Sequence, residues 1–186
     1  KTEKFGAYRK LELDVWELAG PPETWQDQLA AYYEKRPVFA LLGGIGVGSW
    51  EPVHAFCEEQ GIPDILPIAE RPVVSDADWY TLYFSKGVYQ EGEAAARFLR
   101  SSVKLGQDAR IVQVFRSGQK GEDAARGFEE VWEASEQAVA GLASKALSAD
   151  EALSSFLDAE LAEGRLPTVL LLWLDGDEAA AALSGV

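Results

Sequence analysis

The sequence is poor in the residue types that build disulfides and metal sites. It has 186 residues, with one cysteine, one histidine and no methionine. A single cysteine cannot form a disulfide within the chain, and one cysteine with one histidine is too small a set for a zinc site. We therefore expect neither a disulfide framework nor a bound metal or other cofactor. Because position 1 is Lys rather than Met, we also expect the sequence to be an excised or processed part of a longer protein.

Positive charge is also scarce. Lys and Arg number 17 against 31 Asp and Glu, which gives a net charge of −14. Nucleic acids and anionic lipids bind to clustered basic residues. The basic residues here are scattered, so we expect no nucleic-acid partner. No apolar run approaches the about 20 residues that cross a bilayer, so we expect no direct membrane insertion. No apolar signal segment opens the chain, although an exported protein would already have lost one.

Apolar content is high enough for a folded core, since 47% of the residues are hydrophobic and 11% are aromatic. Strand-like and helix-like patterns alternate along the chain. The expected strands span residues 11–18, 38–42, 64–68, 79–84, 110–115, 142–147 and 168–174. The expected helices span residues 22–36, 51–60, 90–103, 122–136 and 148–163, and the residues after Asp175. This alternation predicts an α/β fold of doubly wound parallel sheets, in which the first three strands are parallel neighbours.

The chain is long enough for two small lobes. The polar stretch at residues 101–108 is the candidate boundary between them. We expect lobe I at residues 1–104, in the order strand, helix, strand, helix, strand, strand, helix. We expect lobe II at residues 105–186, built of strand–helix repeats. The continuous apolar run at residues 38–42 predicts a strand that is buried on both faces.

A glycine-rich stretch at residues 43–49 separates an expected strand from an expected helix. Ligands of parallel α/β sheets bind in such loops, and the N–H groups at a helix N-terminus can hold an anionic group. The dinucleotide fingerprint needs a third glycine where Ser49 or Glu51 stands, and the lysine of a phosphate-binding loop is missing. A ligand-lining loop and a structural tight turn both remain open.

The sequence provides no evident catalytic group. His54 lies within an expected helix, without a nucleophile and an orienting carboxylate in recognisable spacing, so we expect a surface or half-buried residue. Cys57 lies on the apolar side of the same helix, and we expect a small buried thiol. We assign no catalytic residue and no metal ligand.

Bulky and charged residues follow several expected strands, where packing does not require them. Loop-borne aromatic and charged side chains suit a small-molecule cleft, although a surface role is open for each. Arg71 and Trp79 also lie in such places, and Trp79 is expected in the core. The candidate ligand-binding residues are Gly48, Ser49, Trp50, Glu70, Tyr89 and Arg116. We expect Ser49, Trp50, Glu70 and Tyr89 to face one cleft, with Arg116 opposite.

Four segments, in order, resemble a known family. They are residues 39–68 (FALLGGIGVGSWEPVHAFCEEQGIPDILPI), 79–99 (WYTLYFSKGVYQEGEAAARFL), 110–134 (RIVQVFRSGQKGEDAARGFEEVWEA) and 168–185 (TVLLLWLDGDEAAAALSG). Together they are similar to the type I periplasmic solute-binding proteins, the Leu/Ile/Val-binding protein class of ABC-transporter receptors. Residues 78–87 (DWYTLYFSKG) are also similar to the branch of this family that is associated with c-type cytochromes, although the sequence has no haem motif.

The resemblance implies a two-lobed fold that is incomplete at both ends, with a strand and helix missing before Leu11 and further strands missing after Val186. It implies a periplasmic or extracellular, non-enzymatic module that closes on a small solute. Closure would signal to the membrane subunits of an ABC transporter or to a fused partner domain. Two alternatives remain: an enzyme on a Rossmann-like sheet, and a degenerate binding fold that serves as a sensory or protein-interaction domain.

The sequence departs from the family pattern at the expected ligand contacts. Members that bind amino acids use hydroxyl side chains in two loops, whereas here only Ser49 is a hydroxyl in the first loop and Glu70 stands near the expected Thr. The Tyr-Gly of the second lobe becomes Lys120-Gly121. A solute carboxylate near Glu70 would be repelled, and Trp50 would favour a cation. We therefore expect a cationic or aromatic solute, or no small ligand, rather than leucine or valine.

Overall fold

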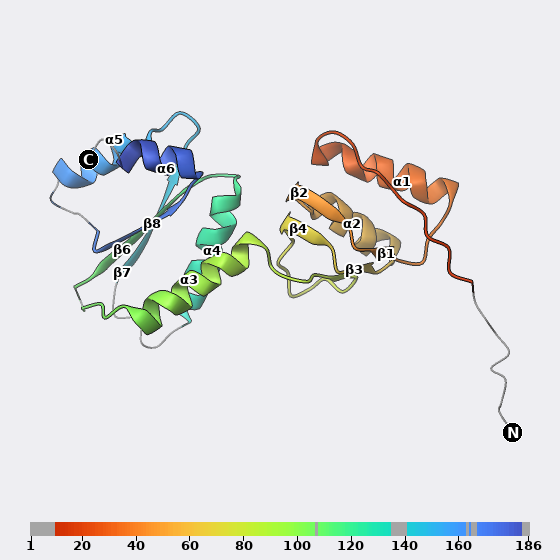
Figure 1. Cartoon of the computed structure of the whole chain (residues 1–186), viewed down its shortest axis with the longest axis horizontal. Coiled ribbons are helices and arrows are strands. Elements are labelled where there is room, and N and C mark those ends of the chain that lie inside the picture. Colours follow the sequence, from red (N-terminus) through yellow and green to blue (C-terminus); the bar gives the residue numbers. More distant parts are fainter. Residues whose placement is uncertain (1–9, 107, 135–140, 163, 165–166, 184–186) are drawn as a thin grey trace, which may run out of the picture.

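The computed structural model describes residues 10–106, 108–134, 141–162, 164 and 167–183. Figure 1 shows two lobes side by side, the first with the early strands and helices and the second with β6 to β8. The elements are η1 (Pro22–Thr24), α1 (Trp25–Lys35), β1 (Leu41–Leu42), β2 (Ile45–Ser49), α2 (Glu51–Gln60), β3 (Asp64–Ile65), β4 (Ile68–Arg71), β5 (Thr81–Leu82), α3 (Val88–Ser102), β6 (Arg110–Arg116), α4 (Lys120–Glu133), β7 (Gly141–Leu147), α5 (Leu153–Ala162), β8 (Val169–Trp173) and α6 (Gly176–Leu183).

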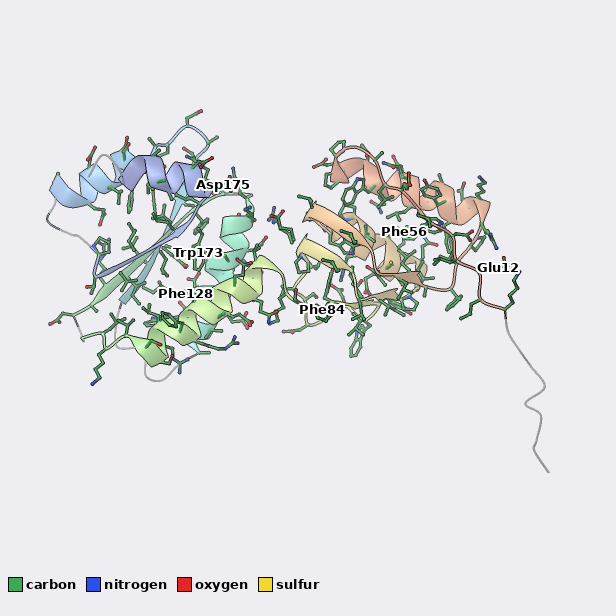
Figure 2. The ribbon with its side chains drawn as sticks, viewed as in Figure 1. Glu12, Phe56, Phe84, Phe128, Trp173 and Asp175 are labelled. Atoms are coloured by element: carbon green, nitrogen blue, oxygen red, sulfur yellow. The ribbon has the colours of Figure 1, made fainter. Side chains whose placement is uncertain are left out.

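The sheet of the second lobe is parallel and covered on both faces. Its strand order is β7-β6-β8, and both pairings are parallel. Side chains of β6, the central strand, point alternately to the two faces of the sheet. Ile111 joins a core cluster with α3 and α4, whereas Val112 and Val114 join another cluster with α5. Figure 2 shows Phe128 and Trp173 on the side of α3 and α4, where their ring centroids are 6.3 Å apart. The predicted α/β fold with parallel sheets is confirmed.

The first lobe has a helical layer on one face of its strands. Strands β1, β3 and β5 form one parallel sheet, and β2 and β4 form a parallel pair. Trp25 and Leu29 of α1 pack with Val53 and Phe56 of α2 in one core cluster. The large hydrophobic side chains exposed on this lobe include Phe39, Leu42, Ile45, Val47, Ile68, Leu82 and Phe84. The prediction that strand 38–42 is buried on both faces is therefore wrong, because among the described residues no helix covers the second face.

The segment expected as the first strand is irregular. Residues 10–19 form neither a helix nor a strand. Side chains attach the segment to α1 instead: Trp16 stacks on Tyr32 with centroids 5.4 Å apart, and Asp14 accepts a hydrogen bond from Arg36 over 2.8 Å. The alternating pattern indicated a strand, but among the described residues no strand pairs with it. The expected parallel neighbours are therefore confirmed only for β1 and β3.

The glycine-rich stretch, expected as a loop, contains strand β2. Its Ile45 and Gly46 pair with Ile68 and Ala69 of β4. The next expected strand is divided into β3 and β4 by Leu66, whose φ of 56° is in the left-handed region. Both differences arise because the chain turns after β1 and after β3. The segments that follow, β2 and β4, then pair with each other as a second short parallel pair.

The expected helices are all present. Helix α2 spans the predicted residues, and Gly61 with φ of 64° ends it. Helix α5 begins at Leu153 rather than at Ser148, although the Ser148 N–H donates to the Glu151 carboxylate over 3.5 Å as a capping box requires. Within the part of the chain that the structure describes, no helix is both long and apolar enough to cross a membrane.

Helices α3 and α4 approach each other closely. A Cβ on Gly92 would lie 1.8 Å from the Ala124 carbonyl oxygen, and a Cβ on Gly127 would lie 2.1 Å from the Tyr89 carbonyl oxygen. Only glycine allows the two helix backbones to touch at these points. Helix α3 thus packs with the sheet of the second lobe. The division of the chain after residue 104 stays a prediction, and this packing favours a division before α3.

We predict that Gly92→Ala lowers the free energy of unfolding by about 2–3 kcal/mol, because the added methyl group must push the two helices apart. Gly176→Ala is the matched control, since a Cβ on this helical glycine meets no atom of the described residues within 4 Å. Urea denaturation followed by circular dichroism measures both. Equal stability of the two variants would contradict the close helix contact.

Candidate functional site

Polar side chains gather where the carboxyl ends of the strands of both lobes face each other. Glu70 and Arg71 end β4, Lys120 begins α4 directly after the β6 turn, and Asp175 follows β8. The Lys120 Nζ lies 3.3 Å from the Glu70 Oε1 and 3.7 Å from the Asp175 Oδ1. Figure 2 labels Asp175 on the side of the second lobe that faces the first. We define Gly48, Ser49, Glu70, Arg71, Lys120, Asp123 and Asp175 as the interlobe cluster.

The Glu70 carboxylate connects three segments. Its Oε2 accepts a hydrogen bond from the Gly48 N–H over 3.1 Å, while Oε1 accepts one from Lys120. The hydrogen bond and charge of Glu70, with a smaller contribution from Asp175, raise the pKa of Lys120 above its usual value. The negative charge of Glu70 is thus balanced within the protein.

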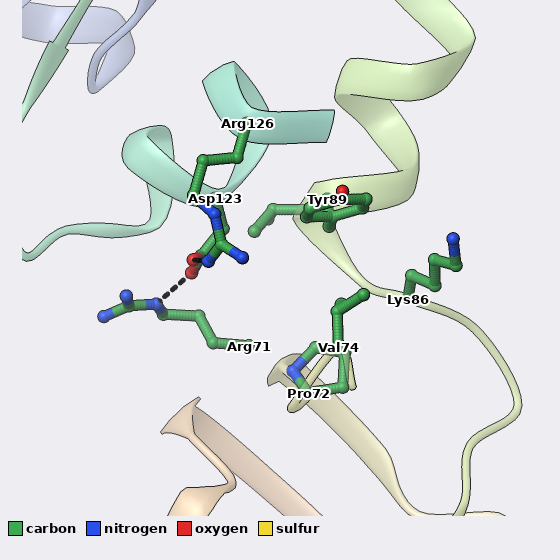
Figure 3. A pocket seen from close by; sticks show the side chains of 8 residues that line it. Arg71, Pro72, Val74, Lys86, Tyr89, Asp123 and Arg126 are labelled. Atoms are coloured by element: carbon green, nitrogen blue, oxygen red, sulfur yellow. Dashed lines mark hydrogen bonds and ion pairs between the residues drawn. The ribbon is translucent and has the colours of Figure 1, made fainter. Parts of the chain in front are cut away.

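Arg71 makes a second connection between the lobes. Its Nε donates to the Asp123 Oδ2 over 2.5 Å, and its Nη1 donates to the Gly118 carbonyl oxygen over 2.8 Å. Figure 3 shows the Arg71–Asp123 pair between β4 and α4. The side chains are only 26% and 19% exposed, so water screens this pair less than an exposed one.

A small hollow adjoins this pair. Figure 3 shows side chains that line it from both lobes. The lining residues are Arg71, Pro72, Val74, Lys86, Val88, Tyr89, Asp123 and Arg126. The Lys86 ammonium and the Arg126 guanidinium lie 5.3 and 5.7 Å from the centre of the Tyr89 ring, which is cation–π geometry. These cations are paired with carboxylates, since Lys86 contacts Glu93 and both arginines contact Asp123.

The structure brings together only some of the predicted ligand-binding residues. Gly48 and Glu70 are hydrogen-bonded, and the Ser49 hydroxyl accepts from the Glu51 N–H over 3.3 Å, at the start of α2. Arg116 is occupied within its own lobe, where it pairs with Glu178 and donates to the carbonyl oxygens of residues 148, 149 and 151. Ligand contacts by these residues remain predictions.

Trp50 does not face a cleft. It is 4% exposed and packs in the core edge-on to Trp25. Its indole Nε1 donates to the Asp64 Oδ2 over 2.8 Å. Cβ atoms on Gly44 and Gly46 would lie 2.6 and 2.5 Å from the indole ring. These two glycines therefore make room for Trp50, which supports the structural interpretation of this part of the glycine run.

Tyr89 holds the helix pair together rather than standing free in a cleft. It is 4% exposed, and its hydroxyl donates to the Glu130 carboxylate. Burial, followed by the hydrogen bond to Glu130, raises the pKa of Tyr89 to about 12. Its side chain also lines the hollow beside Arg71.

Sequence reasoning missed the residues that complete the interlobe cluster from the second lobe. Lys120 was seen only as a departure from the family pattern, while Asp123 and Asp175 resembled ordinary acidic residues at helix starts. Arg71 was noted as loop-borne but was not selected. The signal that identifies them is their position, since each lies at or just after the end of a strand, or in the first turn of the next helix.

The other residues that the sequence singles out, His54, Cys57 and Trp79, lie outside the interlobe cluster. The His54 ring nitrogens lie 3.0 Å from the Tyr83 hydroxyl and 3.0 Å from the Asp78 carboxylate, and the ring is buried rather than at the surface. Cys57 is a buried thiol as expected, and burial raises its pKa to about 12. Trp79 is 86% exposed, so its expected core position is wrong. Among the described residues no group of acidic, His or Cys side chains is arranged to hold a metal ion.

Asp64, the first residue of β3, carries a buried carboxyl group. It is 0% exposed, and its Oδ1 has no hydrogen-bond partner among the described residues, while Oδ2 accepts from Trp50. Burial is the largest influence on its pKa, which is raised. The carboxyl therefore keeps its proton in the folded protein at pH values where the unfolded chain has lost it.

Comparison with known proteins supports the fold. No protein-family model and no curated protein matches the sequence. The solved ABC transporter substrate-binding protein of Desulfitobacterium hafniense, in complex with Leu, is similar with a TM-score of 0.58 and 14% identity, over 88% of this chain and 47% of that chain. A solute-binding protein of Rhodopseudomonas palustris, in complex with 3,4-dihydroxybenzoic acid, has a TM-score of 0.54 and 12% identity, over 88% of this chain and 43% of that one. The chain has the fold of the type I periplasmic binding proteins.

An ABC-type branched-chain amino acid transporter protein of R. palustris gives the same result. Its TM-score is 0.52 at 18% identity, over 89% of this chain and 44% of that chain. The chain thus spans less than half the length of each of these three proteins. At such low identity the similarity establishes the fold alone.

We predict that the stability of the wild type falls, relative to Asp64→Asn, as the pH rises from about 4 toward neutrality. A raised pKa contributes stability that is present below the unfolded value of 3.8 and is lost as the pH rises through the folded value. Urea denaturation across a pH series measures the difference. Asp78→Asn is the control, because hydrogen bonds from Ser75 and His54 lower the pKa of Asp78 below 3.8, so its contribution to stability changes only below about pH 4 and is constant over this range. A pH-independent difference for Asp64→Asn would contradict a protonated Asp64.

We also predict that Arg71 and Asp123 are coupled by about 1–2 kcal/mol in a double-mutant cycle of alanine substitutions. The two charged groups are only 2.5 Å apart, and both side chains are mostly shielded from water. The matched control is the cycle of Arg126 with the same Asp123, since that pair is 3.5 Å long and Arg126 is 59% exposed. We expect a coupling below about 0.5 kcal/mol there. Equal couplings would contradict a special role for the interlobe pair.

Proposed function

We propose that this chain is part of a non-enzymatic, extracytoplasmic ligand-binding protein whose two lobes close on a small solute. The observation that carries the proposal is that carboxyl ends of parallel strands from both lobes meet at one place. Ligands of parallel α/β sheets bind beyond the carboxyl ends of the strands. Here these ends supply main-chain N–H groups and charged side chains from both sides, as in Gly48 and Lys120.

The chemistry of the site supports binding rather than catalysis. The charged groups of the interlobe cluster are paired with one another, as Glu70 is with Lys120 and Arg71 is with Asp123. His54 is hydrogen-bonded to the Tyr83 hydroxyl and to the Asp78 carboxylate, and neither residue belongs to the interlobe cluster. The site offers hydrogen-bond donors and charges for recognition, and its described residues include no nucleophile in contact with a base.

The solved structures of the same fold support a solute as the ligand class. Their ligands include Leu and 3,4-dihydroxybenzoic acid, and the proteins are described as components of ABC transporters. Under this proposal, the whole protein interacts with the membrane subunits of an ABC transporter or with a fused partner domain. Periplasmic or extracellular localisation follows in the same way.

A sensory domain is the second candidate. A protein of Bacteroides fragilis described as a LacI transcriptional regulator has the same fold, with a TM-score of 0.50 and 18% identity over 89% of this chain. The fold therefore also occurs in regulators. Paired charges across the lobes favour this candidate, since they already connect the lobes without a solute.

Isothermal titration and thermal shift with a panel of solutes test the proposal. The panel contains neutral, cationic, anionic and aromatic compounds, and includes leucine, valine and 3,4-dihydroxybenzoic acid. We expect at least one compound to raise the unfolding temperature, because a ligand that binds only the folded state stabilises it. Gly48→Val, which places a side chain at a φ of 84°, should abolish the effect. A panel without any stabilising compound would favour the sensory or protein-interaction candidate.

A further inference from the structure

We propose that Gly48 and Lys120 form a carboxylate-binding subsite that the protein fills with its own Glu70. A solute carboxylate can occupy this subsite only when Glu70 leaves it. The inference rests on the proposed solute-binding function and assigns the ligand chemistry of one part of the site. It also gives Glu70 the role of a tethered competitor rather than that of a direct ligand contact.

The two donors are those that recognise a carboxylate. The Gly48 N–H points at one oxygen of Glu70 over 3.1 Å, and the Lys120 ammonium lies 3.3 Å from the other. A main-chain N–H and an ammonium on opposite oxygens provide charge-assisted hydrogen bonds to an anion. The same pair of donors would accept a free carboxylate of any small acid.

An irregularity in the pairing of β2 with β4 orients the first donor, the Gly48 N–H. The register between β2 and β4 shifts between Gly46, opposite Ala69, and Ser49, opposite Arg71. Two residues of β2 thus face the single Glu70 of β4, which is the arrangement of a β-bulge. Gly48 occupies the bulge with a φ of 84°, a conformation that glycine adopts without strain. The bulge turns the Gly48 N–H out of the ladder and toward the side chain.

The second donor comes from the other lobe, so the filled subsite also joins the lobes. Lys120 begins α4 and is shared with Asp175, whose carboxylate lies 3.7 Å from the ammonium. Because Glu70 is attached to β4, its local concentration at the two donors greatly exceeds that of a dissolved acid. Free carboxylates therefore bind the wild-type protein weakly at this place.

Chemical rescue by acetate tests the proposal directly. Glu70→Ala removes a –CH2–COO⁻ group, so acetate has the size and charge of the missing part. We expect acetate to bind the variant at least tenfold more tightly than the wild type, and to shift the Gly48 amide signal in a ¹H–¹⁵N correlation spectrum in a saturable way. Sodium chloride at matched ionic strength should cause no such shift.

Two controls isolate the subsite. Glu59→Ala also removes one carboxylate from an exposed position of the first lobe, and it should leave acetate binding as weak as in the wild type. The double variant Glu70→Ala with Lys120→Ala keeps the vacancy but loses the cation, and it should lose the acetate response. Persistence of the response in the double variant would overturn the role of Lys120.

Equal acetate binding by the wild type and by folded Glu70→Ala would overturn the proposal, as would the lack of any Gly48 response in the folded variant. If Glu70→Ala does not fold, Glu70→Gln provides a second test. It keeps the size of the side chain, and the pKa of Lys120 should fall toward its usual value, because Glu70 is the main cause of its increase. An unchanged pKa would overturn the proposal. The solute panel on the wild type is a separate measurement, so failure of solute binding there is distinguishable from failure of acetate rescue.

Discussion

Helices α3 and α4 touch backbone to backbone at Gly92 and Gly127, and much of the arrangement around the interlobe cluster depends on this contact. Helix α3 follows directly after the strands of the first lobe, whereas α4 carries Lys120 and Asp123 at its start. Packing the two helices together therefore brings the first turn of α4 to the carboxyl end of β4. A wider helix pair would move the cations and anions of the two lobes out of hydrogen-bond range, because such contacts weaken steeply with distance.

The charges at this junction are arranged as complementary pairs rather than as a field of one sign. In a chain with a net charge of −14, like charges brought together would repel. Each carboxylate of Glu70 and Asp123 instead meets a cation from the other lobe. This pairing removes the repulsion that a solute carboxylate would meet from an isolated Glu70. The expected preference for cationic or aromatic solutes was based on an unpaired Glu70 and on an accessible Trp50, whereas Glu70 is paired and Trp50 is buried; the preference stays a prediction.

Position along a strand was sufficient to select two residues that lie together, although their contacts with a ligand stay predictions. Gly48 and Glu70 were selected because they follow strands, and they are hydrogen-bonded in the structure. Trp50 was selected for the same reason, but its side chain turns into the core. The direction of a side chain at a strand end depends on the turn that follows, and Gly44 and Gly46 open space on the inner side. Composition and residue spacing do not determine which way a side chain at a strand end points.

The sequence alone determined the alternation of helices and strands, the parallel sheets and the buried thiol of Cys57, because these depend on local periodicity and on apolar content. Tertiary structure decided which strands found partners and which charges met. Residues 10–19 have the alternating pattern of a strand yet pair with none among the described residues. Glu70 and Lys120 are 50 residues apart in the chain, and Arg71 and Asp123 are 52 apart. Contacts over such separations follow from how whole helices and sheets pack, and local patterns carry no record of that packing.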